Sequence, residues 1–194
     1  EINETDVDKL VDIIAALEPT FGGINMEDIK APECFMVEEK LRQRMKIPVF
    51  HDDQHGTAIV AAAAIYNGLK IVEKKIEDVK LVVSGAGAAS IACVDLLVSM
   101  GLQKKNVRMI DRTGVIYAGR TEGMNPGKQG YAIETTDRTI EDAIDGADLF
   151  MGLSGPGVLN GDLLKKMGKK PIILAMSNPI PEIMPEDAIA ARPD

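Results

Sequence analysis

Four acidic residues in two adjacent pairs are the side chains of this sequence most suited to chemistry. Asp52 and Asp53 lie between the only two histidines, in the stretch FHDDQHGTA, and Glu27 and Asp28 form the second pair. Each pair follows an apolar stretch, so two segments that end side by side would bring up to four carboxylates together. Such a cluster is stable only if protons or a cation neutralise it. An oxygen-only ligand set suits Mg²⁺ or Mn²⁺.

Two other interpretations of these residues stay open. His51 and His55 have i, i+4 spacing, but no third nitrogen or thiolate ligand for zinc is evident, and Cys34 is the only nearby thiol. One or both acidic pairs can instead be solvated, with Asp53 capping the helix that follows Gly56. On their own, the two histidines are interpreted as orienting or packing groups.

A glycine-rich stretch, SGAGAAS, lies between an apolar run at Val79–Val83 and a predicted helix. In a dinucleotide fingerprint the first glycine permits a tight turn, and the second lets the backbone approach a pyrophosphate at a helix N-terminus. The third small position is Ser90, which still permits close helix packing. The alternative is a glycine-rich turn without a ligand. The predicted cofactor-binding residues are Gly85, Ala86, Gly87, Ala88 and Ala89.

Asp111 ends the next apolar strand, where a dinucleotide fold places the acid that binds the adenosine ribose. A carboxylate there favours NAD because it repels a 2′-phosphate, whereas the adjacent Arg112 can hold that phosphate. We include both residues in the predicted cofactor site. The choice between NAD and NADP stays open.

The elements that must position these residues follow from hydrophobic periodicity. Amphipathic or apolar helices are expected at 6–17, 33–45, 58–69 and 91–100, with shorter helices at 140–144 and 161–167. Apolar runs at 47–50, 79–83, 106–111, 147–155 and 170–179 predict strands, and 113–137 is expected to be irregular. Strands that alternate with helices predict the α/β class, with a Rossmann-like doubly wound parallel sheet. We place a domain boundary after residue 53 and expect residues 54–194 to form the nucleotide-binding domain.

Composition excludes several classes of partner. The 194 residues carry a net charge of −8, which argues against nucleic acid and against an anionic membrane surface. The longest apolar run, Ala58–Tyr66, is too short to span a bilayer, and no signal peptide is recognised. Cys34 and Cys93 form no CxxC motif, and a disulfide between them is not excluded. A reduced, cytoplasmic location is expected.

Six motifs in fixed order carry a resemblance over nearly the whole chain. They are GGINMEDIKAPECF, IPVFHDDQHGTA, SGAGAAS, DRTGVIY, GLSGPGVL and SNPIPEI. Together they resemble the bacterial malic enzymes, of the type that can carry a phosphotransacetylase-like region. Such enzymes convert (S)-malate to pyruvate and CO₂ with NAD(P)⁺ and Mg²⁺ or Mn²⁺. The resemblance strengthens the metal interpretation, and it implies that residues 1–53 end an α/β substrate and metal domain that precedes the nucleotide-binding domain.

The resemblance also implies roles for individual residues. Glu27, Asp28 and Asp53 match the metal carboxylates. Asp52 sits beside them, where we expect it to orient a ligand or assist proton transfer. Asn178, in SNP, matches an asparagine that contacts the substrate or the nicotinamide. The alternative interpretation, from turn chemistry alone, is that Asn178 is a turn residue before a proline. A homo-oligomer is expected, with the apolar helix at 58–69 in the core or at an interface.

One part of the family's machinery has no counterpart in this chain. The tyrosine and lysine that act as acid and base lie upstream of the metal motif in the family, and none of Tyr66, Tyr117 and Tyr131 corresponds. We therefore expect a central fragment that keeps the nucleotide geometry but turns malate over weakly or not at all alone. Two rival functions stay open: a metal-independent NAD(P)-linked dehydrogenase, and a non-enzymatic nucleotide-binding module.

Overall fold

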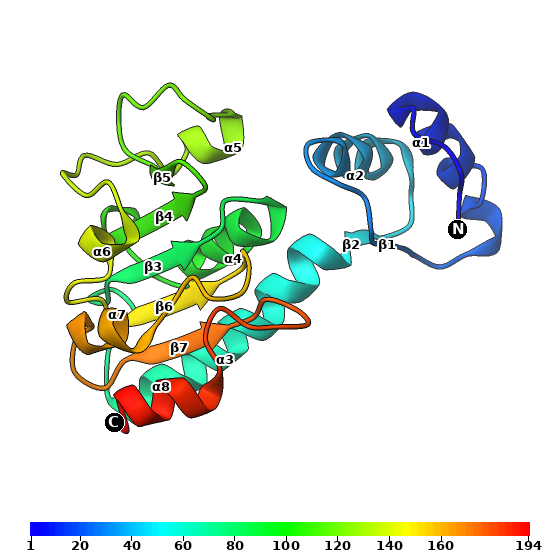
Figure 1. Cartoon of the computed structure of the whole chain (residues 1–194). Coiled ribbons are helices and arrows are strands. Elements are labelled where there is room, and N and C mark those ends of the chain that lie inside the picture. Colours follow the sequence, from blue (N-terminus) through cyan, green and yellow to red (C-terminus); the bar gives the residue numbers. More distant parts are fainter.

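The computed structural model describes all residues from 1 to 194. A small N-terminal part and a larger sheet-containing part lie apart and are joined by one long helix (Figure 1). That helix is α3, Thr57–Val72, and it continues directly from a π-helical turn, η2, at Asp52–Gly56. The domain boundary predicted after residue 53 thus falls inside a helical segment, and it stays a prediction.

The N-terminal part packs two helices on a two-stranded sheet. Helix α1 spans Val7–Ala15 and α2 spans Glu33–Arg44, while β1 spans Ile24–Met26 and β2 spans Val49–His51. A short 3₁₀ turn, η1, at Glu18–Thr20 follows α1. The helices bury apolar side chains against the strands, which removes that surface from water. The buried members are Val11, Ile14, Met26, Val37, Leu41, Met45 and Val49.

Strands β1 and β2 pair in parallel, with Met26 opposite His51. Both strands therefore end at the same edge of this small sheet. The residues that follow each strand, Glu27–Asp28 and Asp52–Asp53, start from neighbouring positions.

The larger part contains a five-stranded sheet in the order β5-β4-β3-β6-β7. Its parallel strands are β3 (Leu81–Ser84), β4 (Val107–Asp111), β6 (Leu149–Gly152) and β7 (Ile172–Ala175). The edge strand β5 (Gly114–Val115) is antiparallel to β4. From β3 the chain builds outward to β4 and then returns to β6 on the other side, so the order reverses beside β3. In doubly wound folds, ligands bind at this reversal, outside the carboxyl ends of the strands.

Helices cover both faces of this sheet, as a doubly wound fold requires. Helices α3 and α4 (Ala88–Ser99) pack on the face that carries Leu81 and Val83, and α6 and α7 pack on the face that carries Val82. Successive strand residues point to opposite faces, which explains the continuous apolar runs. The predicted Rossmann-like α/β class is confirmed. The remaining helical elements are η3 at Lys104–Asn106, α5 at Pro126–Gln129, α6 at Ile140–Ala143, α7 at Gly161–Lys166 and α8 at Pro185–Ala191.

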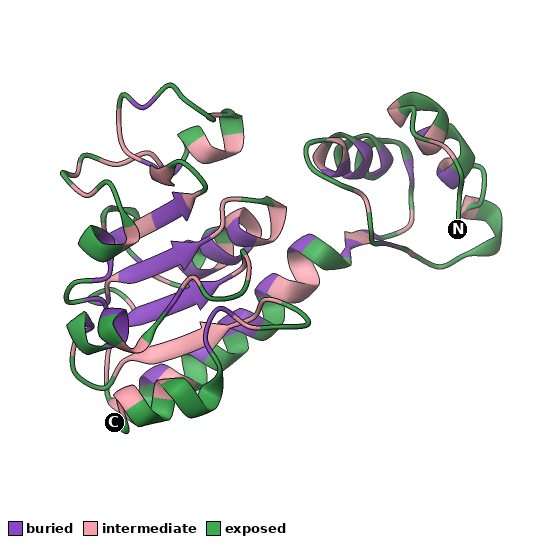
Figure 2. Cartoon of the chain, viewed as in Figure 1, coloured by how far each residue is buried: buried purple, intermediate pink, exposed green.

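The two central strands, β3 and β6, are buried along their whole length (Figure 2). The exposed apolar side chains lie outside these strands. One of them is Ile71, near the end of α3, which is 80% exposed. Among the helices, none is both long enough and apolar enough to pass through a bilayer.

We predict that Phe150→Ala lowers the free energy of unfolding by about 3–5 kcal/mol, because it opens a cavity in the core between β6 and the α6–α7 layer. Ile71→Ala is the matched control and should change it by less than about 0.5 kcal/mol. Urea denaturation followed by circular dichroism measures both. A loss below about 1 kcal/mol for Phe150→Ala would contradict the packing described here.

Candidate active site

The glycine loop occupies the turn between β3 and α4, at the carboxyl end of the sheet. Gly85 has φ of 117°, and a Cβ there would lie 2.5 Å from the backbone oxygen of Leu153, so no other residue fits. Gly87 is the N-cap of α4, and a Cβ at Gly87 would meet nothing within 4 Å. The second glycine thus faces open space, and the unpaired N–H groups of the first turn of α4 are available to an anion.

A groove of about 870 Å³ runs from this loop along the ends of the neighbouring strands. It contains three of the five predicted loop residues, together with Asp111 and Arg112 from the end of β4. Ala88 and Ala89 follow as the first residues of α4. The groove is lined by Ser84, Gly85, Ala86, Gly87, Ile110, Asp111, Arg112, Thr113, Gly114, Gly123, Lys128, Arg138, Thr139, Ile140, Leu153, Ser154 and Val158.

Asp111 does not present a free carboxylate to the groove. Arg120 donates from Nη2 to both carboxylate oxygens at 2.7 and 2.8 Å, and Lys128 Nζ donates to Oδ2 at 2.6 Å. The backbone N–H of Thr113 donates to Oδ1 at 2.9 Å. Burial by itself would raise the pKa of Asp111, but the hydrogen bonds from Lys128 and Arg120 outweigh burial and hold it below its usual value. Its negative charge is therefore compensated within the protein.

Arg120 and Lys128 were not recognised from the sequence. Both lie in the segment expected to be irregular, nine and seventeen positions after Asp111. The Arg120 side chain is 3% exposed and also donates to the backbone oxygens of Gly114 and Val115. Arg112, in contrast, is exposed and forms no ion pair within 4.0 Å. In the groove, the carboxylate of Asp111 is therefore already paired with basic side chains, whereas the guanidinium of Arg112 has no ion-pair partner.

The acidic pairs meet through a single hydrogen bond. The backbone N–H of Asp28 donates to Asp53 Oδ2 at 2.8 Å, which joins the segment after β1 to the segment after β2. All four carboxylate residues are exposed, and Asp28 has φ of 60°. The Asp52 carboxylate points forward along η2 toward Gly56, since a Cβ on Gly56 would lie 2.2 Å from Asp52 Oδ1. The glycine of the HDDQHG stretch therefore leaves room for the Asp52 carboxylate.

The oxygen donors of Glu27, Asp28 and Asp53 fit a hard divalent cation by type and by position at one sheet edge. The structure brings Asp53 to the Glu27–Asp28 segment. It does not gather three or more Asp, Glu, His or Cys side chains into one ligand group. The ligand assignment stays a prediction.

The two histidines do not face each other across a metal site. His51 is fully buried, and neither of its ring nitrogens has a hydrogen-bond partner. His55 Nε2 lies 2.7 Å from Oε1 of the buried Glu38 on α2. Gln54 Nε2 donates to the other oxygen of Glu38 at 3.5 Å. Glu38 was not recognised from the sequence, and it ties η2 to α2.

The acidic segment and the glycine loop belong to packed elements. η2, which begins with Asp52 and Asp53, packs against α4, whose first turn carries the glycine loop. The arrows of the four parallel strands β3, β4, β6 and β7 point toward the N-terminal part (Figure 1). Asn178 follows β7 at this same edge and is exposed. The carboxyl ends of both sheets thus border one region of the molecule.

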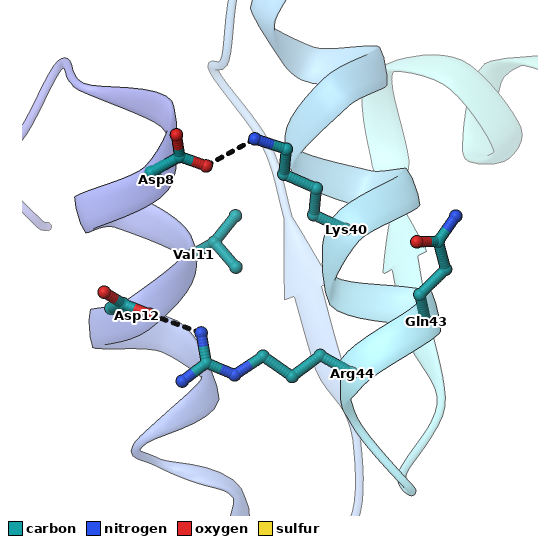
Figure 3. A pocket seen from close by; sticks show the side chains of 6 residues that line it. All are labelled: Asp8, Val11, Asp12, Lys40, Gln43 and Arg44. Carbon is teal, nitrogen blue, oxygen red and sulfur yellow. Dashed lines mark hydrogen bonds and ion pairs between the residues drawn. The ribbon is translucent and has the colours of Figure 1, made fainter.

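A separate hollow of about 310 Å³ lies between α1 and α2, away from this region (Figure 3). Asp8 pairs with Lys40 and Asp12 pairs with Arg44 across it, with Val11 between the pairs (Figure 3). Because every acid there already has a basic partner, we interpret this hollow as a helix–helix contact.

We predict that Arg120→Ala destabilises the protein at neutral pH by about 3 kcal/mol, because it leaves Asp111 partly unpaired in a buried place. Since the folded-state pKa of Asp111 is lowered, its ionic contribution is present above the unfolded value and is lost as pH falls through the folded pKa. The difference between Arg120→Ala and the wild type should therefore shrink as pH falls below about 4.

The control for this prediction is Lys165→Ala, which removes an exposed pair with Asp162 and should cost less than about 1 kcal/mol at any pH. Guanidinium denaturation over a pH series measures these differences. If the difference in free energy of unfolding between the wild type and Arg120→Ala stays constant with pH, the charge of Asp111 does not contribute to stability.

Comparison with known proteins identifies the group to which this architecture belongs. The family model described as "Malic enzyme, NAD binding domain" matches residues 54–192, and the model described as "Malic enzyme, N-terminal domain" matches residues 1–42. The NADP-dependent malic enzyme of Haemophilus influenzae is 62% identical over 195 residues, which cover 100% of this chain and 26% of that protein. The NAD-dependent malic enzyme of Rhizobium meliloti is 57% identical over 194 residues, covering 100% and 25%.

Solved structures agree with this comparison. The crystal structure of the NAD-dependent malic enzyme from Thermotoga maritima superposes with a TM-score of 0.92 at 45% identity, over 98% of this chain and 51% of that one. The chain thus spans about half of that solved chain and about a quarter of the curated relatives. Together, the doubly wound fold, the glycine loop and the matches over the full sequence establish that this chain belongs to the malic enzyme family.

Proposed function

We propose that the protein oxidatively decarboxylates (S)-malate to pyruvate and CO₂, with reduction of NADP⁺ and with Mg²⁺ or Mn²⁺ as cofactor. One observation carries this proposal: η2, with the Asp53 carboxylate bonded to the segment after β1, packs on the helix that begins at the glycine loop. An oxygen-rich site beside a dinucleotide groove suits an oxidation of a hydroxy acid. Because the chain spans only about a quarter of the two curated relatives named above, the activity proposed is that of the whole protein.

The proposed cofactor roles follow from the groove. Backbone N–H groups at Gly85–Ala89 bind the pyrophosphate at the N-terminus of α4. Asp111, already bonded by Arg120 and Lys128, no longer repels a 2′-phosphate, and the unengaged Arg112 is available to bind one. These charges support NADP⁺ over NAD⁺. The relatives' names include both cofactors.

The proposed metal residues are Glu27, Asp28 and Asp53. The chemistry that a divalent cation supplies when bound is that of a Lewis acid, which favours loss of the C2 hydroxyl proton and stabilises the negative charge left when CO₂ departs. Asp52, one position before Asp53 and packed over Gly56, orients a ligand or assists proton transfer. Asn178, on the loop after β7, donates its amide to the substrate or to the nicotinamide.

Two further proposals concern the setting of this activity. We expect the protein to form a homo-oligomer in the cytoplasm and to act on a small molecule, with no nucleic acid or membrane partner. Apolar residues exposed in the first turn of α3, Ile59 and Val60, are available to an oligomer interface. Sedimentation of the purified protein measures the oligomeric state.

The activity is tested with the protein at its full natural length, purified free of metal. With (S)-malate and Mn²⁺, we expect reduction of NADP⁺ and release of equal amounts of pyruvate, with kcat/KM about tenfold or more higher for NADP⁺ than for NAD⁺. A chelator should abolish the reaction, and added Mn²⁺ should restore it.

The same experiment separates the rival functions. Oxidation of a substrate that survives the chelator would favour a metal-independent NAD(P)-linked dehydrogenase. Calorimetry that detects no binding of NAD⁺ or NADP⁺ would favour a non-enzymatic module with a purely structural glycine turn. Either result would overturn the proposed function.

A further inference from the structure

Glu182, in the loop between β7 and α8, is a buried carboxylate without a cationic partner. Its residue exposure is 0%, and no Lys, Arg or His lies within 4.0 Å of it. Burying a carboxylate is unfavourable unless hydrogen bonds replace its lost hydration. The partners that replace water here therefore indicate what the residue does.

The two carboxylate oxygens of Glu182 bind two different loops. The backbone N–H of Ser154, in the loop after β6, donates to Oε1 at 2.9 Å, and the Ser154 hydroxyl lies 3.5 Å from the same oxygen. The backbone N–H of Ser177, in the loop after β7, donates to Oε2 at 3.1 Å. One side chain thus binds the residues two positions beyond the ends of two neighbouring parallel strands.

The hydrogen bonds extend to a third strand. Ser154 Oγ lies 2.7 Å from the Oγ of Ser84, which is the last residue of β3 and directly precedes the glycine loop. Glu182, Ser154 and Ser84 therefore link the carboxyl ends of β7, β6 and β3. These are the ends at which the groove for the dinucleotide lies.

The absence of a side chain at Gly152 leaves room for the Glu182 carboxylate. A Cβ on Gly152, the last residue of β6, would lie 2.3 Å from Cδ of Glu182 and within 2.8 Å of both of its oxygens. Gly152 is itself buried and has no positive φ, so packing against Glu182 is what requires a glycine there.

We propose that Glu182 is a positioning residue, which holds the loops after β6 and β7 so that Asn178 faces the reacting end of the cofactor. Ser177, bonded to Oε2, immediately precedes Asn178, and Ser154, bonded to Oε1, lines the dinucleotide groove. The part of this proposal that concerns malate rests on the proposed function. Glu182 is not a catalytic residue, since its carboxylate is enclosed by the protein.

Glu182→Gln tests the proposal in the protein at its full natural length. The substitution keeps the shape but replaces one acceptor oxygen by an NH₂ group, which meets a backbone N–H instead of binding it. One of the two loops is thereby released. We expect kcat/KM for malate to fall roughly 10- to 100-fold, mainly through kcat, because a charged hydrogen bond is lost from one of the two loops that together position Asn178.

Two further measurements on Glu182→Gln distinguish the proposed positioning role from a general contribution to stability. Binding of 2′,5′-ADP, a probe of the adenosine half of the site, should stay within about twofold of wild type, because that half is held by Asp111 and its partners. Amide hydrogen exchange at Ser154 or Ser177 should rise about tenfold or more, and this readout does not depend on turnover.

Two variants accompany Glu182→Gln. Glu186→Gln removes an exposed acid from the first turn of α8 and should leave turnover and loop exchange unchanged. In Gly152→Ala, the added methyl group displaces the Glu182 carboxylate. This variant should reproduce the effect of Glu182→Gln on amide exchange and on malate turnover. It also keeps the test available if Glu182→Gln fails to fold.

Unchanged loop exchange in both Glu182→Gln and Gly152→Ala would overturn the positioning role. Parallel loss of 2′,5′-ADP binding and turnover would also overturn it, because it would indicate general damage. If the wild type does not oxidise malate, the proposed function fails, and loop exchange then decides the role of Glu182 by itself.

Discussion

Parallel pairing of β1 with β2 is the constraint on which the acidic site depends. Because the two strands run in the same direction and Met26 lies opposite His51, the chain must leave both strands at one edge. The backbone N–H of Asp28 then bonds the Asp53 carboxylate at 2.8 Å. Four acidic residues are thereby concentrated at one edge, an arrangement whose repulsion a divalent cation would relieve. Without this pairing, the acidic residues would be four unrelated surface charges.

The continuous helical segment formed by η2 and α3 connects these acidic residues to the larger sheet. η2 begins at Asp52, runs into α3 without a break and packs against α4. The buried Glu38, bonded to His55, ties the start of this segment to the N-terminal helices. The position of the acidic residues relative to the glycine loop is thus set by packed helices, which deform less readily than loops. In the reaction we propose, metal-bound substrate and nicotinamide must meet, and this packing supplies the fixed geometry.

The parts of the fold that carry strong local patterns could be predicted from the sequence. The apolar runs of β3, β4, β6 and β7 and the glycine turn after β3 were recognised, because buried parallel strands are apolar on both faces and Gly85 is required by sterics. The predicted strand at 47–50 is displaced by one or two residues to Val49–His51, which is the usual uncertainty of element ends. The π-helical turn at η2 is not predicted, because hydrophobic periodicity does not mark such a short turn.

The partners of the candidate site could not be predicted from local pattern. Arg120 and Lys128 bond Asp111 across nine and seventeen residues of irregular chain, and no periodicity marks such a contact. Glu38 contacts Gln54, 16 positions away, and Glu182 contacts Ser154, 28 positions away. In sequence, both glutamates resemble ordinary surface acids. Long-range hydrogen bonds of this kind become visible only when the tertiary structure brings the segments together.

Direct measurement of Mn²⁺ binding tests the central claim, that carboxylates after β1 and β2 hold one divalent ion. Titration of the metal-free full-length protein with Mn²⁺, followed by electron paramagnetic resonance, compares the wild type with Asp53→Asn. The variant keeps an oxygen that can accept the Asp28 N–H bond but removes the charge. We predict one saturable site in the wild type and affinity more than about tenfold weaker in Asp53→Asn, with Glu186→Gln as unchanged control. Equal Mn²⁺ affinity in the wild type and in Asp53→Asn would contradict the claim.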